Sequence, residues 1–259
     1  MSSKRTTARD SSHDENYKPA KTLDGSVVKV MAKINDREDV LVASVNGADG
    51  IGLYRMERAY RSCETPAMER ELVRSMRSTF SLFEGLPITV CLWDGVGSER
   101  PPVGPVGLEA SMGGIKRLME CSDFTRTQLR ALLQMAVEHD IRILVPTITL
   151  SEELEWVRAM LEEVSEDVGV DILPPLGDLV ESPHAARGAD EFGRCADFLS
   201  VCVSGSNQVR EEECRIRDTH RNRGSAPNDA AILRVVQTAV DKERSTCVPI
   251  EVCDKLGHV

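Results

Sequence analysis

Arg55 is the residue whose type and position in this sequence point most directly to chemistry. It follows residues 51–54 (Ile-Gly-Leu-Tyr), a short apolar run entered through Gly50. Such a run is typical of a buried strand that begins at a tight turn. Arg55 would then lie at the carboxyl end of the strand, where parallel α/β folds place ligand-binding groups. A guanidinium group there can bind a small anion, and the alternative is an ordinary salt bridge at the surface.

The elements that would position Arg55 alternate along the chain. We predict strands at residues 27–34, 51–54, 88–93, 142–147, 177–181, 198–203 and 247–253, and helices at 37–46, 66–83, 125–139, 152–164 and 229–240. Thr65 and Ser151 are predicted helix N-caps. Alternating strands and helices require crossover connections and a parallel sheet. The length of 259 residues suits one (β/α)8 barrel, and 41% apolar residues supply a core.

Composition excludes several classes of partner. The net charge of −10 argues against a nucleic acid or an anionic membrane, so any anion site must depend on local arginines. Eight cysteines are scattered without a Cys-x-x-Cys pair, which is typical of a reducing compartment. With no signal-like or membrane-length apolar run, we expect a cytoplasmic protein. Residues 1–20 are polar and are expected to be a disordered tail, which leaves 21–259 for the barrel.

Five phrases carry a resemblance to a known family. They are residues 47–57 (Gly-Ala-Asp-Gly-Ile-Gly-Leu-Tyr-Arg-Met-Glu), 125–133 (Thr-Arg-Thr-Gln-Leu-Arg-Ala-Leu-Leu), 143–147 (Ile-Leu-Val-Pro-Thr), 180–183 (Val-Glu-Ser-Pro) and 248–253 (Val-Pro-Ile-Glu-Val-Cys). In this order they resemble the barrel domain of the phosphoenolpyruvate (PEP)-utilising enzymes, above all enzyme I of the bacterial sugar phosphotransferase system. The resemblance implies a TIM barrel of the PEP/pyruvate-binding type. Because the chain ends six residues after Cys253, we expect the last helix to be missing.

The resemblance also implies a set of arginines that bind the substrate. Arg55 matches the family's first arginine, which grips the substrate phosphate. Cys91 stands where the second arginine is expected, and Arg100 is the candidate replacement if its loop folds inward. The third arginine has no counterpart in residues 104–115. Lys33, at the end of the first predicted strand, either returns one positive charge or is a surface lysine.

The metal and acid residues that the resemblance implies are also altered. Glu181 matches one magnesium ligand of the family, and the alternative is an exposed carboxylate. Without gaps, Gly205 stands where the family has the aspartate that is the second metal ligand. With a three-residue insertion, which fits the family phrase better, Asn207 matches an asparagine at the substrate and Gln208 replaces that aspartate. Magnesium binding should therefore be weak or lost, because magnesium is usually held through carboxylates. Cys253 matches the cysteine that protonates the product, and the alternative is a small core residue.

The altered residues predict impaired catalysis. Each charge-assisted hydrogen bond contributes roughly 1.5–3 kcal/mol, so two missing arginines weaken PEP binding by roughly 10²–10⁴. We expect a barrel that is related to PEP-protein phosphotransferase and binds PEP or a related small carboxylate. We expect it to lack the phosphohistidine domain. Its partner would be a phosphohistidine carrier protein, and a homodimer remains open because the family commonly dimerises through this domain. The alternatives are a non-catalytic regulator or scaffold and, less favoured, a lyase- or aldolase-like enzyme acting on a keto acid.

Overall fold

The computed structural model describes residues 20–21, 27–35, 37–60, 68–94, 114–180, 192, 194–202 and 250–253. The strands are β1 Ala20–Lys21, β2 Val27–Val28, β3 Ala32–Ile34, β4 Ile51–Arg55, β5 Pro87–Cys91, β6 Asp140–Pro146, β7 Leu176–Val180, β8 Phe198–Cys202 and β9 Ile250–Cys253. The helices are α1 Arg37–Val45, α2 Glu57–Tyr60, α3 Met68–Phe80, the 3-10 turn η1 Ser81–Phe83, α4 Ile115–Glu120, α5 Ser122–Ala136 and α6 Ser151–Val168.

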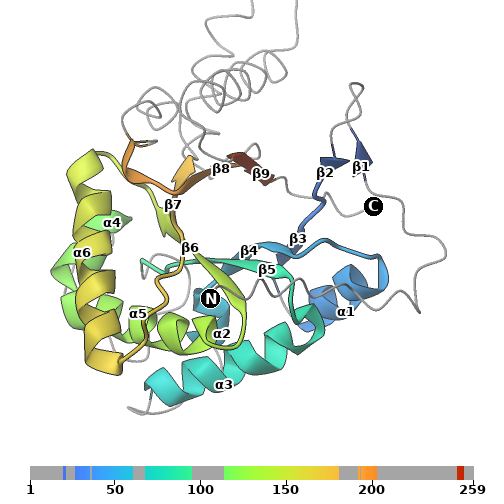
Figure 1. The fold of residues 1–259 in the computed structure, drawn as a ribbon, viewed down its shortest axis with the longest axis horizontal. Helices are drawn as coiled ribbons and strands as arrows, with labels where there is room; N and C mark the ends of the chain where they lie inside the picture. Colours follow the sequence, from blue (N-terminus) through green and yellow to red (C-terminus); the bar gives the residue numbers. More distant parts are fainter. Residues whose placement is uncertain are drawn as a thin grey trace, which may run out of the picture.

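A parallel sheet forms the centre of the molecule (Figure 1). In the described part of the chain it contains seven strands in the order β3-β4-β5-β6-β7-β8-β9, and every neighbouring pair is parallel. β4 and β9 also contact each other although neither is the other's neighbour in the sheet, so the sheet curves round on itself. The predicted α/β barrel architecture is confirmed. The predicted loss of the last helix concerns residues beyond 253, which lie outside the described part.

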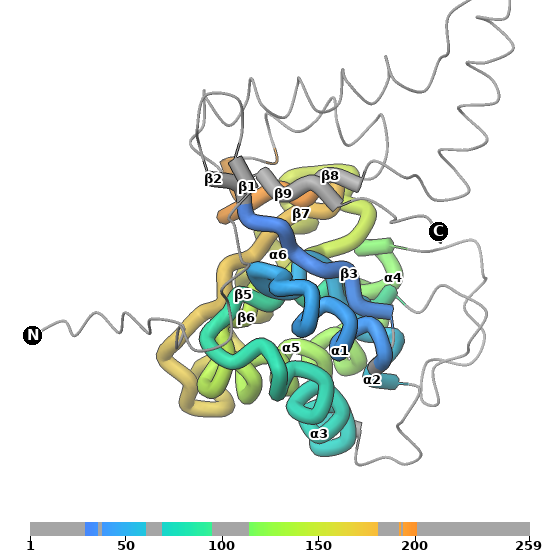
Figure 2. The backbone as a smooth tube through the Cα atoms, turned by 90° about the vertical axis from the view of Figure 1, so that its right-hand side faces the viewer, coloured from blue at the N-terminus to red at the C-terminus, as the bar shows by residue number. Residues whose placement is uncertain are grey.

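The helices lie on the outside of this curved sheet (Figures 1 and 2). α3 packs beside α5, and α5 packs beside α6. Most buried apolar side chains lie between the helices and the strands, whereas a second, smaller cluster comprises Leu53, Cys91, Leu144, Leu179 and Phe198. These five residues come from five neighbouring strands, on the face opposite the helices. Two apolar layers separated by the sheet are the pattern expected of a packed barrel interior.

Phe198, the first residue of β8, lies in the barrel interior toward the amino ends of the strands. Its ring lies against Gly177 of β7, where an added Cβ would come within 2.5 Å of the ring. The guanidinium carbon of Arg142 lies 4.0 Å from the centroid of the same ring. Burial lowers the pKa of Arg142, and the neighbouring Asp140 opposes that shift. The ring of Phe198 therefore fills the space beside Gly177, which has no side chain, and the guanidinium group of Arg142 covers the ring.

The predicted strand at 27–34 is in fact two strands. β2 pairs with β1 in an antiparallel pair, and only β3 belongs to the barrel sheet. Between β2 and β3, the N–H of Val30 donates to the carboxylate of Asp49, and the N–H of Asp49 donates to the carbonyl of Val30, each at 2.8 Å. Val30 is thus bonded to the turn that precedes β4, which interrupts the strand.

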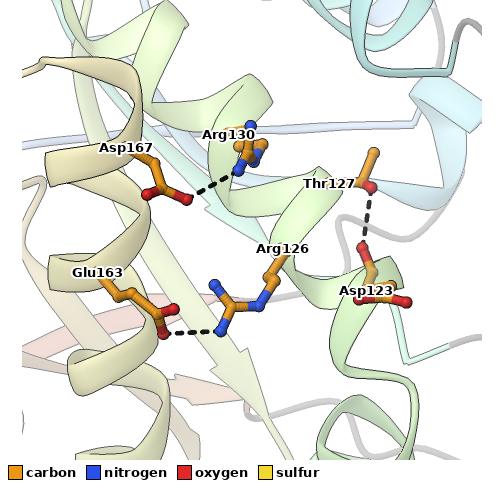
Figure 3. A network of polar contacts seen from close by, with 6 residues as sticks. All are labelled: Asp123, Arg126, Thr127, Arg130, Glu163 and Asp167. Carbon is orange, nitrogen blue, oxygen red and sulfur yellow. Dashed lines mark hydrogen bonds and ion pairs between the residues drawn. The ribbon is translucent and has the colours of Figure 1, made fainter.

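Two ion pairs join α5 to α6 along their length (Figure 3). Nη2 of Arg126 lies 2.7 Å from Oε2 of Glu163, and Nη2 of Arg130 lies 2.9 Å from Oδ2 of Asp167. Both arginines and both acids are spaced four residues apart, so each helix presents one row of charges to the other. The hydrogen bond between Arg126 and Glu163 lowers the pKa of Glu163 and raises the pKa of Arg126.

The beginning of α6 corrects one prediction. Ser151 is not the N-cap but the first residue of the helix. The carboxylate of Glu153 accepts hydrogen bonds from the backbone N–H groups of Thr149 and Leu150, at 2.7 and 3.0 Å. Glu153 therefore supplies the glutamate half of a capping box, because its buried carboxylate reaches back to N–H groups that precede the helix, whereas a capping serine would accept from N–H groups of the first turn.

Other predictions lie partly outside the described residues. The predicted tail at 1–20 lies outside the described residues except for Ala20, which forms β1 with Lys21, the first residue of the predicted barrel. The helix at 229–240 and the cap at Thr65 also lie outside the described residues. None of the helices in the described part is long and apolar enough to cross a membrane.

Candidate functional site at the carboxyl ends of the strands

Arg55 is the last residue of β4, as the sequence predicted. Side chains alternate between the two faces of a strand, and Leu53 belongs to the interior cluster while Tyr54 belongs to the outer one. Arg55 is therefore on the inner face of the sheet, at its carboxyl edge, and it is half-buried. This is the position at which barrel enzymes bind their ligands.

Cys91 is the register partner of Arg55 on the neighbouring strand β5. Its side chain is fully buried in the interior cluster, and its thiol contacts the carbonyl oxygen of Leu92 at 3.5 Å. A thiol in this position carries no positive charge to a ligand. Arg55 consequently has a small, neutral neighbour on β5, and this agrees with the prediction that one positive charge is missing there.

The chain is firmly held where it leaves β5. The side-chain amide of Gln128, from α5, accepts a hydrogen bond from the N–H of Trp93 at 2.8 Å and donates one to the carbonyl of Trp93 at 3.0 Å. Gln128 is fully buried. One side chain thus satisfies both backbone groups of a residue that lies beyond the end of its strand.

The next residue, Asp94, connects the ends of β5 and β6. Its carboxylate accepts a hydrogen bond from the N–H of Gly114 at 2.6 Å. Gly114 has a φ of 73°, and an added Cβ would lie 2.7 Å from the Cβ of Thr147, just after β6. Thr147 itself has a φ of 52°, which is rare for a β-branched residue. Gly114 is therefore bonded to the end of β5 through Asp94 and packs closely against the end of β6 at Thr147.

Three aromatic rings join this edge to the segment that follows Arg55. The ring of Trp93 lies 4.9 Å from that of Tyr60 and 5.8 Å from that of Phe124, centroid to centroid. Tyr60 ends α2, which begins two residues after Arg55, and the N–H of Met56 donates to the carbonyl of Cys91 at 3.0 Å. The positions of β4, α2 and the end of β5 are therefore coupled.

The other predicted site residues divide into two groups. Lys33 is half-buried in β3 and pairs in register with Leu53, two residues before Arg55. Cys253 is the last residue of β9, and its register partner is Cys202. Arg100, Glu181, Asn207 and Gln208 lie outside the described residues. β7 ends at Val180, so the chain reaches the carboxyl edge just before Glu181.

The described residues do not form a magnesium site. Among them, no three His, Cys, Asp or Glu side chains are placed together to hold a metal ion. Asp94, an acid at this edge, accepts a hydrogen bond from a backbone N–H through its carboxylate. Glu181 and Gln208, the two residues predicted as magnesium ligands, lie outside the described part.

Comparison with known proteins identifies the family. The sequence profile described as "PEP-utilising enzyme, PEP-binding domain" matches residues 9–258, nearly the whole chain. The chain belongs to the PEP-utilising enzymes. As a member of that family, it corresponds to the PEP-binding domain, which agrees with the resemblance carried by the five sequence phrases.

Curated relatives of this PEP-utilising chain are longer than it is. It is 30% identical over 252 residues to the multiphosphoryl transfer protein of Rhodobacter capsulatus, covering 96% of this chain and 30% of the relative. It is 31% identical over 229 residues to the phosphoenolpyruvate-protein phosphotransferase of Geobacillus stearothermophilus, covering 85% of this chain and 39% of the relative. The chain therefore spans less than half the length of these relatives.

A solved structure supports the fold. The chain is similar to a citrate lyase from Burkholderia xenovorans LB400, with a TM-score of 0.51 and 14% identity, covering 86% of this chain and 62% of that one. At this identity the likeness shows the architecture alone.

Sequence reasoning missed Gln128 and Asp94 as residues of this site. Gln128 lies in the phrase 125–133, among the buried positions Thr125, Leu129 and Leu132 that recur with helical spacing. A glutamine on the core-facing side of an amphipathic helix indicates a buried hydrogen bond. That signal could have identified Gln128, but the sequence does not show that its partner is Trp93.

Proposed function

We propose that this chain binds PEP or a related small carboxylate at the carboxyl edge of the barrel, and that Arg55 is the principal anion contact. Phosphoryl transfer to a separate phosphohistidine carrier is inefficient or absent. The protein would act in the cytoplasm, where its scattered cysteines stay reduced. Membership of the PEP-utilising family supports the ligand class, since the matching profile is that of a PEP-binding domain.

The observation that carries the proposal is the pairing of Arg55 with the buried Cys91. A trianionic ligand needs several cations around it, both for binding and for neutralising the charge that moves during transfer. An arginine on β4 without one beside it on β5 can hold a carboxylate or a phosphate. It cannot supply the charge of a complete phosphoryl-transfer site.

A binding experiment tests this proposal. Calorimetric titration with PEP, pyruvate and oxalate, each with and without magnesium, would compare the wild type with Arg55→Ala. Losing one or two charge-assisted hydrogen bonds of roughly 1.5–3 kcal/mol should weaken binding by about tenfold to several hundredfold. Arg74→Ala is the matched control, because Arg74 is exposed on α3, on the outside of the barrel.

Two results would overturn the proposal. Unchanged affinity in Arg55→Ala would show that the ligand is bound elsewhere. Rapid pyruvate release from PEP with magnesium and a phosphohistidine carrier would show that phosphoryl transfer is intact. A complementary variant, Cys91→Arg, should tighten oxalate binding if the missing charge on β5 limits affinity, although a larger side chain in this buried position lowers stability.

A further inference from the structure

The end of β5 is held more strongly than the sheet alone requires. Beyond Cys91, the N–H of Leu92 still donates to the carbonyl of Leu144 on β6 at 2.9 Å, but Trp93 continues past the ladder. Gln128 takes over both hydrogen-bonding groups of Trp93. This amide comes from a residue 35 positions away in sequence, on a helix of the outer layer.

The fixed position of Trp93 is transmitted to both sides of the site. On one side, the ring of Trp93 packs on Tyr60, and the backbone N–H groups of Ala59 and Tyr60 both donate to the carbonyl of Met56, next to Arg55. On the other side, Asp94 holds Gly114 against Thr147. Gln128 thus fixes the backbone between these two sets of contacts.

We infer that Gln128 is a positioning residue for the anion-binding edge. It does not touch the ligand itself but orients the Trp93–Asp94 backbone, and through Tyr60 and Met56 it fixes the segment from which Arg55 projects. This inference rests on the proposed function, because it assumes that Arg55 binds the anion. Small displacements of a positioned binding group can weaken its interaction by one to two orders of magnitude.

Three variants separate this role from a general contribution to stability. Gln128→Leu keeps much of the volume but removes both hydrogen bonds to Trp93. Gln128→Glu keeps the acceptor for the Trp93 N–H and removes the donor to its carbonyl at neutral pH. Gln134→Leu is the matched control: this glutamine lies on the same helix, and its side chain donates to Glu69 of α3, far along the helix from Trp93.

The probe is oxalate, titrated calorimetrically against the whole chain at a temperature well below every variant's unfolding midpoint. We expect Gln128→Leu to bind oxalate about tenfold to a hundredfold more weakly, Gln128→Glu to be intermediate, and Gln134→Leu to bind like the wild type. In a Trp156→Phe background, emission from Trp93 should also change in Gln128→Leu but not in Gln134→Leu.

The outcomes distinguish the two proposals. If Arg55→Ala weakens oxalate binding while both Gln128 variants bind normally, the positioning role is wrong and the proposed function stands. An Arg55→Ala variant with unchanged affinity overturns the proposed function, and the positioning role falls with it. If Gln134→Leu weakens binding as much as Gln128→Leu, the effect comes from α5 as a whole, and the specific role of Gln128 is wrong. Should Gln128→Leu fail to fold, Gln128→Glu decides: wild-type affinity in that variant contradicts the inference.

Discussion

Gly177→Ala offers the sharpest test of the barrel interior on which the site rests. An added Cβ would lie 2.5 Å from Cζ of Phe198 and 2.6 Å from both neighbouring ring carbons, far closer than real Cβ contacts. Movement of the ring is restricted, because Phe198 is fully buried and the guanidinium carbon of Arg142 lies 4.0 Å from its centroid. Overpacking of this kind destabilises a core by roughly 1–3 kcal/mol. For a domain of this size that corresponds to a fall in Tm of about 2–4 °C for each kcal/mol.

A double-mutant cycle with Phe198→Leu identifies the cause. If the ring is what the new methyl group meets, the double variant should lose much less stability than the two single variants together, with a coupling of roughly 0.5–3 kcal/mol. Urea denaturation monitored by circular dichroism would supply the four free energies of unfolding. Gly169→Ala is the control, since its Cβ would meet nothing within 4 Å and only its φ of 69° makes alanine unfavourable. Additive effects of Gly177→Ala and Phe198→Leu would refute the close contact.

Three further variants test single interactions. Glu153→Gln should lower the free energy of unfolding by about 1–2 kcal/mol, because it weakens the cap of α6. Glu152→Gln, at an exposed position, should change it little, and equal effects of the two variants would contradict the capping role. Burial lowers the pKa of His139, so the unfolded chain takes up a proton first, and stability should fall as pH drops below about 6.5. His139→Phe should reduce that fall in urea titrations at about pH 8 and about pH 5.5, and an identical pH dependence would contradict this sign. Arg126→Glu should lower Tm, because it places two like charges together. Adding Glu163→Arg should restore Tm, and both effects should diminish in concentrated salt. If the charge swap does not restore Tm, the loss of this ion pair is not the cause of the lower Tm.

The sequence predicted the order and direction of the barrel strands well because their signals are local. Arg55 was expected at a carboxyl strand end from the apolar run before it, and β4 ends at that residue. Short elements were missed for the same reason. α2 and α4 have only 4 and 6 residues, too few for a helical period to appear in the sequence. The interruption near Val30 depends on Asp49, whose distance along the chain hides it from local reasoning.

The candidate site was predictable in its residue types but not in its supporting contacts. The resemblance identified Cys91 as a missing cation, and the register explains the consequence by placing that thiol beside Arg55. No sequence pattern shows that Gln128 hydrogen-bonds to both backbone groups of Trp93. These bonds depend on how α5 is positioned along its axis relative to β5, and the sequence does not encode that position locally. Arg55 can bind an anion only if the backbone beside it keeps a fixed position. The edge beside Arg55 contains a fully buried amide, a carboxylate that accepts from a glycine N–H and a threonine with a positive φ. These features restrict the backbone next to Arg55, so we expect its position to be maintained although its register partner on β5 is a cysteine.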